Sequence, residues 1–256
     1  MALVKTSLAD SIGTIAFDRD DKRNALSAEL IAETISALDE FISGQARVVV
    51  LRSASSGKVW SAGHDVGELP VADVDPLPYS DPLEQLLRAV KAFPAPVIAM
   101  VHGSVWGGAC DLVMACDLVY ADETAGFAIT PAKLGLPYNV GGFLNFMSRL
   151  PLNVVKEMFF SADLITAERA ERVGIVNVMV PATELEDTVY RMARTITTRS
   201  SAAIAAAKES IRVLSEAVPI DPATFEYLHG LRRDVYFGRD YHEGTQAFLD
   251  KRSPNF

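Results

Sequence analysis

Short apolar runs separated by polar turns dominate the first half of the chain. The segments SIGTIAF (11–17), RVVVLRS (47–53) and APVIAMVHG (95–103) predict strands. The unbroken Val run of the second is typical of a strand buried on both faces of a parallel sheet. Between the first two runs Ser27 is a predicted helix N-cap, with Glu29 in the first turn. The following apolar residues recur at helical spacing and should face the core: Leu30, Ile31, Ile35, Leu38 and Ile42.

The same alternation continues toward the middle of the chain. A loop rich in Pro and Asp (70–82) precedes a predicted helix, LEQLLRAVKAF (83–93). After the strand at 95–103 come a helix at GGACDLVMAC (107–116) and short strands at DLVYA (117–121) and GFAIT (126–130). Strands that alternate with helices predict an α/β fold with crossover connections.

The pattern changes near residue 182, after which the sequence lacks strand signals and predicts long helices. We place a soft boundary near residue 190, which gives a core of residues 1–190 and a helical region of residues 191–256.

Composition and charge exclude several classes of protein. Hydrophobic residues make up 49% of the 256 positions, enough for a sizeable core, and the formal net charge is −9. This charge argues against nucleic acid or anionic lipid as the main partner, although local patches could still bind a small anion. No apolar run reaches the about 18 residues that a membrane span needs, and we see no signal peptide. A cytoplasmic location is therefore expected. Cys110 and Cys116 are expected as buried thiols on one helix, without a disulfide or metal role.

Two glycine-containing loops carry the candidate chemistry. In HGSVWGGACDL a strand ends at Gly103, and Gly107 and Gly108 open an apolar helix. A helix N-terminus has unpaired N–H groups and a partial positive charge. The loop SAGHD (61–65) also follows a strand and can direct the N–H of His64 to the same oxygen. Two such amides form an oxyanion hole; the alternative is that the glycines only permit tight packing. In this hypothesis the His64 backbone acts, while its ring packs or bonds locally.

Six segments resemble the crotonase (enoyl-CoA hydratase/isomerase) superfamily in order and spacing, over essentially the whole chain. They are KRNALS, SAGHDV, GSVWGGACDLVMACDLVYA, TPAKLGLPYNVGG, ITAERAERVGIVN and EGTQAFLDKRSPNF. The resemblance implies a crotonase spiral of ββα units with a C-terminal helical trimerisation region. It also implies homotrimers, often paired into hexamers, and an acyl-CoA thioester as substrate, with coenzyme A as part of that substrate and no separate cofactor or metal. The oxyanion amides would be those of His64 and Gly108.

The reaction type depends on side chains near that hole. Hydratases of the superfamily use two glutamates, and the corresponding positions here are Asp111 and Pro131. Proline has no acid or base, so the paired carboxylates are absent and a hydratase is disfavoured. Asp111 could contact substrate, or could simply be favoured by the helix dipole.

Thr130 and Tyr138 are instead expected as neutral hydroxyl donors that orient a carboxylate of the substrate, with no protein carboxylate to repel it. The segments around PYN and the C-terminal RR.VY…DY.EG..AFL.KR.PNF resemble the branch that decarboxylates methylmalonyl-CoA to propionyl-CoA, in which this tyrosine is the proposed catalytic residue.

The resemblance also places coenzyme A along the N-terminal loop and the C-terminal end, where the latter often contributes to a neighbouring subunit. The expected contacts are Arg23, Ala25, Leu26, Ala62, Asp65, Val66, Phe248 and Lys251.

Two alternative functions stay open. One is an enoyl-CoA hydratase or isomerase with an altered acid. The other is a non-catalytic RNA-binding or scaffold protein of the same fold, which the scattered lysines and the net charge of −9 disfavour.

Overall fold

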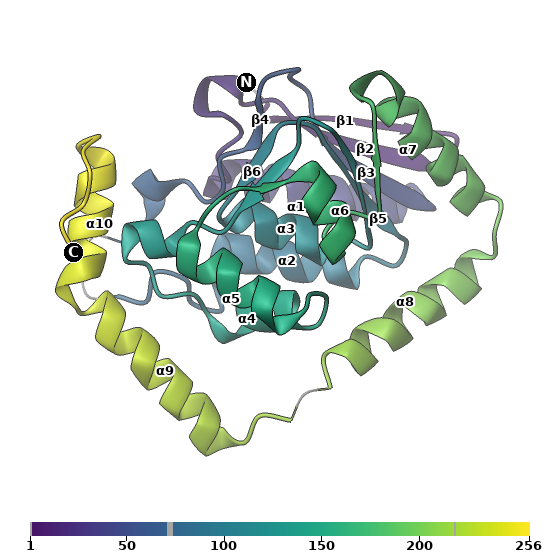
Figure 1. The fold of residues 1–256 in the computed structure, drawn as a ribbon. Coiled ribbons are helices and arrows are strands. Elements are labelled where there is room, and N and C mark those ends of the chain that lie inside the picture. The colour runs from purple at the N-terminus through teal and green to yellow at the C-terminus, as the bar shows by residue number, and fades with distance from the viewer. Residues whose placement is uncertain (1, 71–73, 218) are drawn as a thin grey trace.

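The larger of two sheets forms the centre of the computed structural model, which describes residues 2–70, 74–217 and 219–256 (Figure 1). Its strand order is β1-β2-β3-β5-β7-β10; β1 is antiparallel to β2, and all the other neighbours are parallel. The strands are β1 (Val4–Ala9), β2 (Ile12–Phe17), β3 (Val48–Ser53), β5 (Val97–Val101), β7 (Leu118–Asp122) and β10 (Val178–Val180).

A smaller sheet has the order β4-β6-β8-β9 and is parallel except for its last strand. Its strands are β4 (Val59–Ser61), β6 (Ser104–Trp106), β8 (Gly126–Ala128) and β9 (Ile165–Thr166). Successive pairs β3–β4, β5–β6 and β7–β8 each give one strand to each sheet, and helices follow them. This repeat confirms the predicted α/β spiral of ββα units.

Helices cover both faces of the larger sheet. On one face, Val49 and Leu51 of β3 pack in the main core with apolar side chains from α1, α2 and α3. On the other face, Val48 and Val50 pack with Val189 of α7. Burial on both faces explains the continuous Val run of β3. The helices are α1 (Ala28–Ser43), α2 (Pro82–Ala92), α3 (Gly108–Ala115), α4 (Val140–Met147), α5 (Leu152–Ser161), α6 (Ala167–Val173), α7 (Ala182–Thr197), α8 (Ser201–Ser215), α9 (Pro222–Tyr236) and α10 (Arg239–Leu249).

The predicted N-cap and most of the predicted core face of α1 are confirmed. The Ser27 hydroxyl accepts from the N–H of Leu30. Leu30, Ile31 and Leu38 are buried, and Ile35 is partly buried. The prediction for Ile42 is wrong, because this side chain is 48% exposed. Phe41 takes the inward position of the last turn instead, against Gly13 of β2.

The two cysteines are free and buried, as expected. Cys110 lies in α3, whereas Cys116 is the residue that follows its last turn. Burial raises the pKa of the Cys116 thiol to about 12, so this thiol stays protonated at neutral pH.

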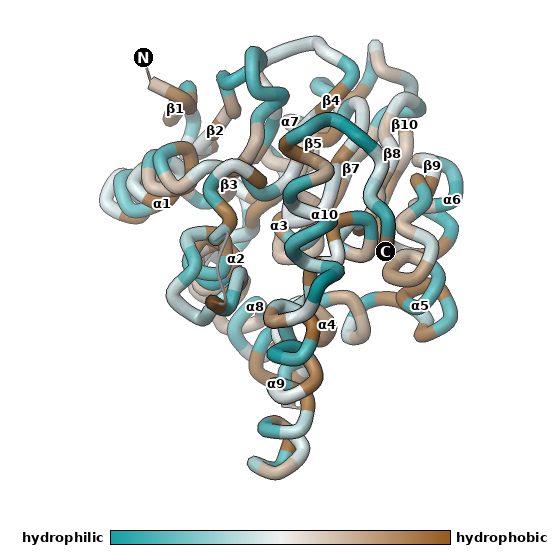
Figure 2. Tube along the Cα trace, turned by 90° about the vertical axis from the view of Figure 1, so that its left-hand side faces the viewer, coloured by the Kyte–Doolittle hydropathy of each residue, from teal (hydrophilic) through white to brown (hydrophobic). Residues whose placement is uncertain are grey.

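The C-terminal segment is helical, as predicted, and forms an arm that leaves the body along α8 and returns through α9 (Figures 1 and 2). The buried Arg232 of α9 makes a bidentate ion pair with Asp75. Its Nη2 lies 2.7 Å from Asp75 Oδ1, and its Nη1 lies 3.0 Å from Oδ2. Residue 190 falls inside α7, which packs on the larger sheet; the division there stays a prediction. Over the described ranges, no helix is long and apolar enough to cross a membrane.

The last helix, α10, lies directly on the 3₁₀ turn Pro131–Leu134. A Cβ atom on Gly244 would come within 2.2 Å of the Leu134 carbonyl oxygen. Only glycine permits this approach, and it brings the end of the chain to the loops of the smaller sheet.

The loop before α1 is fixed by one buried amide, Asn24. Its Nδ2 donates to the Ser53 hydroxyl and to the Trp60 carbonyl, both at 2.9 Å. Its Oδ1 accepts from the N–H of Arg19 at 2.9 Å, and its φ is +50°. One side chain therefore ties this loop to β3 and β4.

We expect Asn24→Gly to lower the free energy of unfolding by about 1–3 kcal/mol, because buried polar groups lose their partners. Asn24→Ala should lower it further, since alanine also adds the strain of left-handed backbone. Urea unfolding of the three proteins measures both effects; an alanine variant more stable than the glycine variant would contradict this account.

Candidate active site

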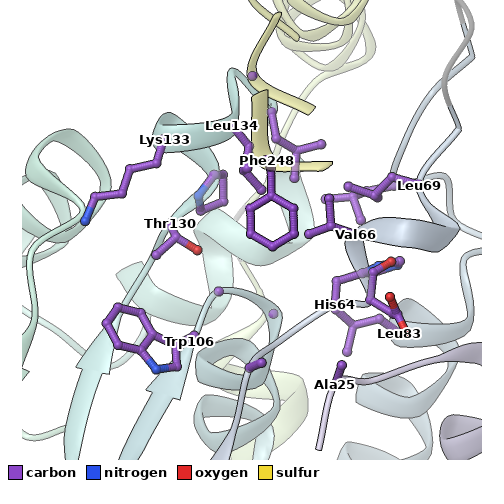
Figure 3. A pocket seen from close by; sticks show the side chains of 18 of the residues that line it. Ala25, His64, Val66, Leu69, Leu83, Trp106, Thr130, Lys133, Leu134 and Phe248 are labelled. Atoms are coloured by element: carbon purple, nitrogen blue, oxygen red, sulfur yellow. The ribbon is translucent and has the colours of Figure 1, made fainter. Parts of the chain in front are cut away.

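A cavity of about 670 Å³ opens between the loops of the smaller sheet and α10 (Figure 3). Of the expected site residues, only Leu26 does not line it, because this side chain is fully buried beneath the loop. The others all do: Arg23, Ala25, Ala62, His64, Asp65, Val66, Gly108, Asp111, Thr130, Tyr138, Phe248 and Lys251.

The backbone amides of His64 and Gly108 lie side by side in this cavity. A Cβ built on Gly108 would lie 3.5 Å from the His64 nitrogen, and one built on Gly63 would lie 3.2 Å from the Gly108 nitrogen. Gly63 has φ +84°, and a side chain there would meet the Trp106 carbonyl oxygen at 2.3 Å. Glycine is thus required where the two loops touch.

Both amides are available to a ligand for structural reasons. Leu26 bonds to the residues on either side of His64, donating to the Gly63 carbonyl and accepting from the Asp65 N–H. In such a parallel bridge the His64 N–H faces away from Leu26. Gly108 is the first residue of α3, so its N–H has no acceptor within the helix. The geometry suits an oxygen that gains negative charge.

The ring of His64 bonds locally, in agreement with the sequence analysis. Its Nδ1 lies 3.2 Å from the Asp65 carbonyl oxygen, and its Nε2 lies 3.3 Å from Asp81 Oδ2. Burial opposes the charged imidazole, but the hydrogen bond and the charge of Asp81 outweigh it, so the pKa of His64 is raised. The Asp81 carboxylate also caps α2 through the N–H of Leu83.

A buried hydrogen-bond network lies at the inner end of the cavity. The Tyr138 hydroxyl donates to Asp111 Oδ2 at 2.8 Å, and Asn145 Nδ2 donates to Asp111 Oδ1 at 2.7 Å. Burial raises the pKa of Asp111, against the two hydrogen bonds that favour its carboxylate. Burial also raises the pKa of Tyr138 well above its ordinary value.

Glu84 is a second carboxyl that the sequence analysis did not place in the site. It lines the cavity from the first turn of α2, and Asn139 Nδ2 donates to its Oε1 at 2.6 Å. Burial raises the pKa of Glu84, and the charges of Asp111 and Asp81 add to this effect. Two carboxyls, Asp111 and Glu84, therefore line the cavity, and the raised pKa of each favours its neutral form. The segment 83–93 shows only helical periodicity, which gave no signal for a site.

The outer end of the cavity carries basic side chains in spite of the acidic net charge. They are Lys22, Arg23, Lys133, Lys251 and Arg252. Such a patch suits an anionic ligand such as a phosphate. Phe248 reaches from α10 between Leu134 and Val66, as Figure 3 shows. Phe248 and Lys251 were expected to serve a neighbouring subunit, but they line the cavity of their own chain, because α10 packs on the turn Pro131–Leu134.

Comparison with known proteins agrees with this geometry. Residues 7–256 match the family model for enoyl-CoA hydratase/isomerase. The chain belongs to the enoyl-CoA hydratase/isomerase family.

Among characterised members of this family, the methylmalonyl-CoA decarboxylase of Escherichia coli (strain K12) is 45% identical over 247 residues, which cover 96% of this chain and 95% of that protein. A probable enoyl-CoA hydratase of Rhodobacter capsulatus is 30% identical and covers 99% of this chain and 97% of that protein. A crystal structure of methylmalonyl-CoA decarboxylase with 2S-carboxypropyl-CoA has a TM-score of 0.97 at 44% identity, and covers 100% of this chain and 98% of that chain.

Pro131, which the resemblance aligns with the second hydratase glutamate, begins a 3₁₀ turn and lines the cavity. Thr130 precedes Pro131, and its Oγ1 would lie 3.1 Å from a Cβ built on Gly107, the residue before Gly108. The Thr130 side chain makes no capping hydrogen bond to the 3₁₀ turn that follows it. The neutral hydroxyl of Thr130 therefore lies beside the two backbone amides.

Proposed function

We propose that this protein decarboxylates methylmalonyl-CoA to propionyl-CoA through a thioester enolate. The observation that carries the proposal is the likeness to methylmalonyl-CoA decarboxylase, which is 45% identical in sequence and whose complex with 2S-carboxypropyl-CoA gives a TM-score of 0.97. Pro131, in the position of the second hydratase acid, supports it against hydration.

The proposed reaction uses the paired amides as its electrostatic catalyst. The bond between C2 and the substrate carboxylate breaks, CO₂ leaves, and the electron pair moves into the thioester as an enolate. The N–H groups of His64 and Gly108 donate to the enolate oxygen. One such donor is typically worth about 3 kcal/mol in the transition state. The thioester carbonyl itself accepts the electron pair, so we propose no cofactor beyond the coenzyme A of the substrate.

Tyr138 and Thr130 are the proposed partners of the substrate carboxylate. A hydroxyl has one proton, and that of Tyr138 points to Asp111 in the structure. Because Asn145 holds Oδ1, a proton on Asp111 would reside on Oδ2, which faces Tyr138. The raised pKa of Asp111 favours this neutral form. Asp111 then donates to Tyr138, and Tyr138 donates to the substrate carboxylate. Fixing this group perpendicular to the thioester plane aligns the breaking bond.

Coenzyme A is proposed to lie along the loop of Arg23, Ala25 and Leu26 and the segment of Ala62, Asp65 and Val66. Arg19 Nη1 pairs with Asp65 Oδ2 at 3.0 Å, which fixes the two segments together. Phe248 would pack on the pantetheine and Lys251 would bind phosphate, since both line the same cavity.

The arm supports a proposed homotrimer, or a hexamer formed by two trimers. Several large apolar side chains of α8 and α9 are exposed in the single chain and would be covered by other copies: Ile211, Leu214, Phe225, Tyr227 and Leu231. The proposed location is the cytoplasm, because both cysteines are free thiols.

The reaction type is tested by incubating the purified protein with methylmalonyl-CoA, malonyl-CoA and crotonyl-CoA and following the products by mass. We expect decarboxylation of methylmalonyl-CoA to exceed hydration of crotonyl-CoA by at least a hundredfold, since Pro131 supplies no acid. Hydration at an equal or higher rate would overturn the proposal.

The oxyanion pair is tested by three variants. His64→Ala keeps the backbone N–H and should lose less than tenfold in turnover. Gly108→Pro removes an N–H and should lose at least a hundredfold. Gly108→Ala is its matched control, because it adds a Cβ against Leu83 but keeps the N–H. If Gly108→Ala lost as much as Gly108→Pro, steric conflict rather than the missing donor would explain the loss.

The order of the hydrogen bonds at Asp111 predicts different costs for two conservative changes. Tyr138→Phe should lower turnover at least tenfold, since a hydrogen bond to a charged group is worth about 1.5–3 kcal/mol. Asp111→Asn should lose less, because its amide can accept from Asn145 and donate to Tyr138 as neutral Asp111 does. Steady-state decarboxylation and thermal unfolding measure both variants. An asparagine variant less active than the phenylalanine variant would show that the Asp111 carboxylate itself is required.

A further inference from the structure

A second cavity, of about 550 Å³, lies where the C-terminal arm returns to the body of the molecule. Its walls come from α2 and α4 of the body and from α8 and α9 of the arm. It meets the first cavity at Leu77, Glu84 and Asn139, which line both. Its volume falls within the range of about 300–1,000 Å³ that is typical of small-molecule sites. The proposed reaction makes no use of this space.

Two guanidinium groups in the lining of the second cavity have a nitrogen without a hydrogen-bond partner. Arg232 of α9 is 6% exposed; both of its Nη atoms bond to Asp75, and its Nε has no acceptor among the described residues. Arg88 of α2 donates from Nη2 to the Tyr79 carbonyl, while its buried Nη1 has no acceptor in the same part of the chain. Buried donors are normally paired, because an unpaired one is costly. Both groups therefore indicate an external acceptor.

Arg88 also lacks a carboxylate partner within the described ranges. The other lysine and arginines of the lining are paired with Glu216 or Asp75. The Cζ atom of Arg88 instead lies 3.8 Å from the centroid of the Tyr79 ring. Glu84, one turn earlier on α2, makes no ion pair with Arg88, and burial raises the pKa of this carboxyl. A guanidinium binds a carboxylate through parallel N–H donors, so Arg88 suits the head group of an organic acid.

Aliphatic side chains form another part of the lining. Leu77 and Leu87 are buried, and Val140 at the start of α4 is partly exposed. A compact inorganic anion would leave these side chains uncovered, whereas the hydrocarbon chain of an organic acid would cover them. The lining thus combines donors for one anionic group with a surface for an apolar body.

We propose that the second cavity binds a small organic carboxylate. Its head group accepts hydrogen bonds from Arg88 and Arg232, and its apolar body packs on Leu87 and Val140. Binding is reversible and forms no covalent bond. It does not depend on which reaction the first cavity catalyses.

Hexanoate is a suitable probe, because it joins one carboxylate to a short aliphatic chain. Calorimetry with the purified protein at constant ionic strength should show that it binds. Hexanamide has the same chain without the charge, and inorganic phosphate has charge without a chain. Each should bind at least about tenfold more weakly than hexanoate. Equal affinity for either compound overturns the proposal, as does the absence of hexanoate binding.

Arg88→Met tests the head-group contact. It removes the guanidinium but keeps a long side chain, and it should weaken hexanoate binding at least about tenfold. Arg172→Met is the matched control, because it makes the same change at an exposed position on α6 and should bind as wild type does. Thermal unfolding shows whether each variant is folded. An unchanged affinity in folded Arg88→Met overturns the proposal.

Gly141→Leu distinguishes the two cavities. Gly141 lines the second cavity and is not among the residues described as lining the first. A Cβ there would lie 3.6 Å from Asn139 Oδ1 and 4.0 Å from Glu84 Oε2, which are ordinary contact distances. Leucine also favours the helix more than glycine does. The added side chain should weaken hexanoate binding at least about tenfold by occupying the space. Hexanoate that binds this variant as tightly as wild type lies elsewhere, and the proposal is then wrong.

Discussion

Parallel pairing of β4 with β6 is the constraint on which the site depends. Parallel neighbours end at the same edge of a sheet, so the loops after Ser61 and Trp106 must meet. They meet closely enough that Gly63 has no room for a side chain. As a result the amides of His64 and Gly108 are held by the fold and need no reorganisation when a charged oxygen forms between them.

Burial in the same cavity also changes the pKa values of the carboxyl groups that line it. Burial disfavours a carboxylate more than its neutral form, and the pKa values of Asp111 and Glu84 are both raised. Their hydrogen bonds differ. Asp111 accepts from Asn145 and from Tyr138, one on each oxygen, whereas Asn139 donates to one oxygen of Glu84.

The C-terminal arm completes the cavity by a close backbone contact. Gly244 of α10 lies on the carbonyl of Leu134, and the ion pair between Arg232 and Asp75 anchors α9 beside it. This arrangement brings Phe248 and Lys251 to a cavity whose other walls are formed more than 100 residues earlier in the chain. The closing element therefore belongs to the same chain as the loops that it covers.

Local patterns in the sequence determined much of the fold. The Val run of β3, the cap at Ser27 and the spacing of Leu30 and Leu38 follow from burial and hydrogen bonding within a few residues, which a sequence displays directly. The loop motifs likewise indicated that the amides of His64 and Gly108 would meet, because glycine at a strand end marks unusual backbone. Ile42 was misplaced, since Phe41 competes for the same inward position.

Only the tertiary structure decided how the side chains of the site divide their roles. Tyr138 and Asp111 are 27 residues apart and Glu84 and Asn139 are 55 apart, so their hydrogen bonds depend on how α2, α3 and α4 pack. The periodicity of residues 83–93 predicts a helix but not which cavity its first turn faces. The pKa shifts follow from burial, which is a property of the whole packed chain. A sequence lists the acids, and packing decides which of them are buried, paired and able to carry a proton.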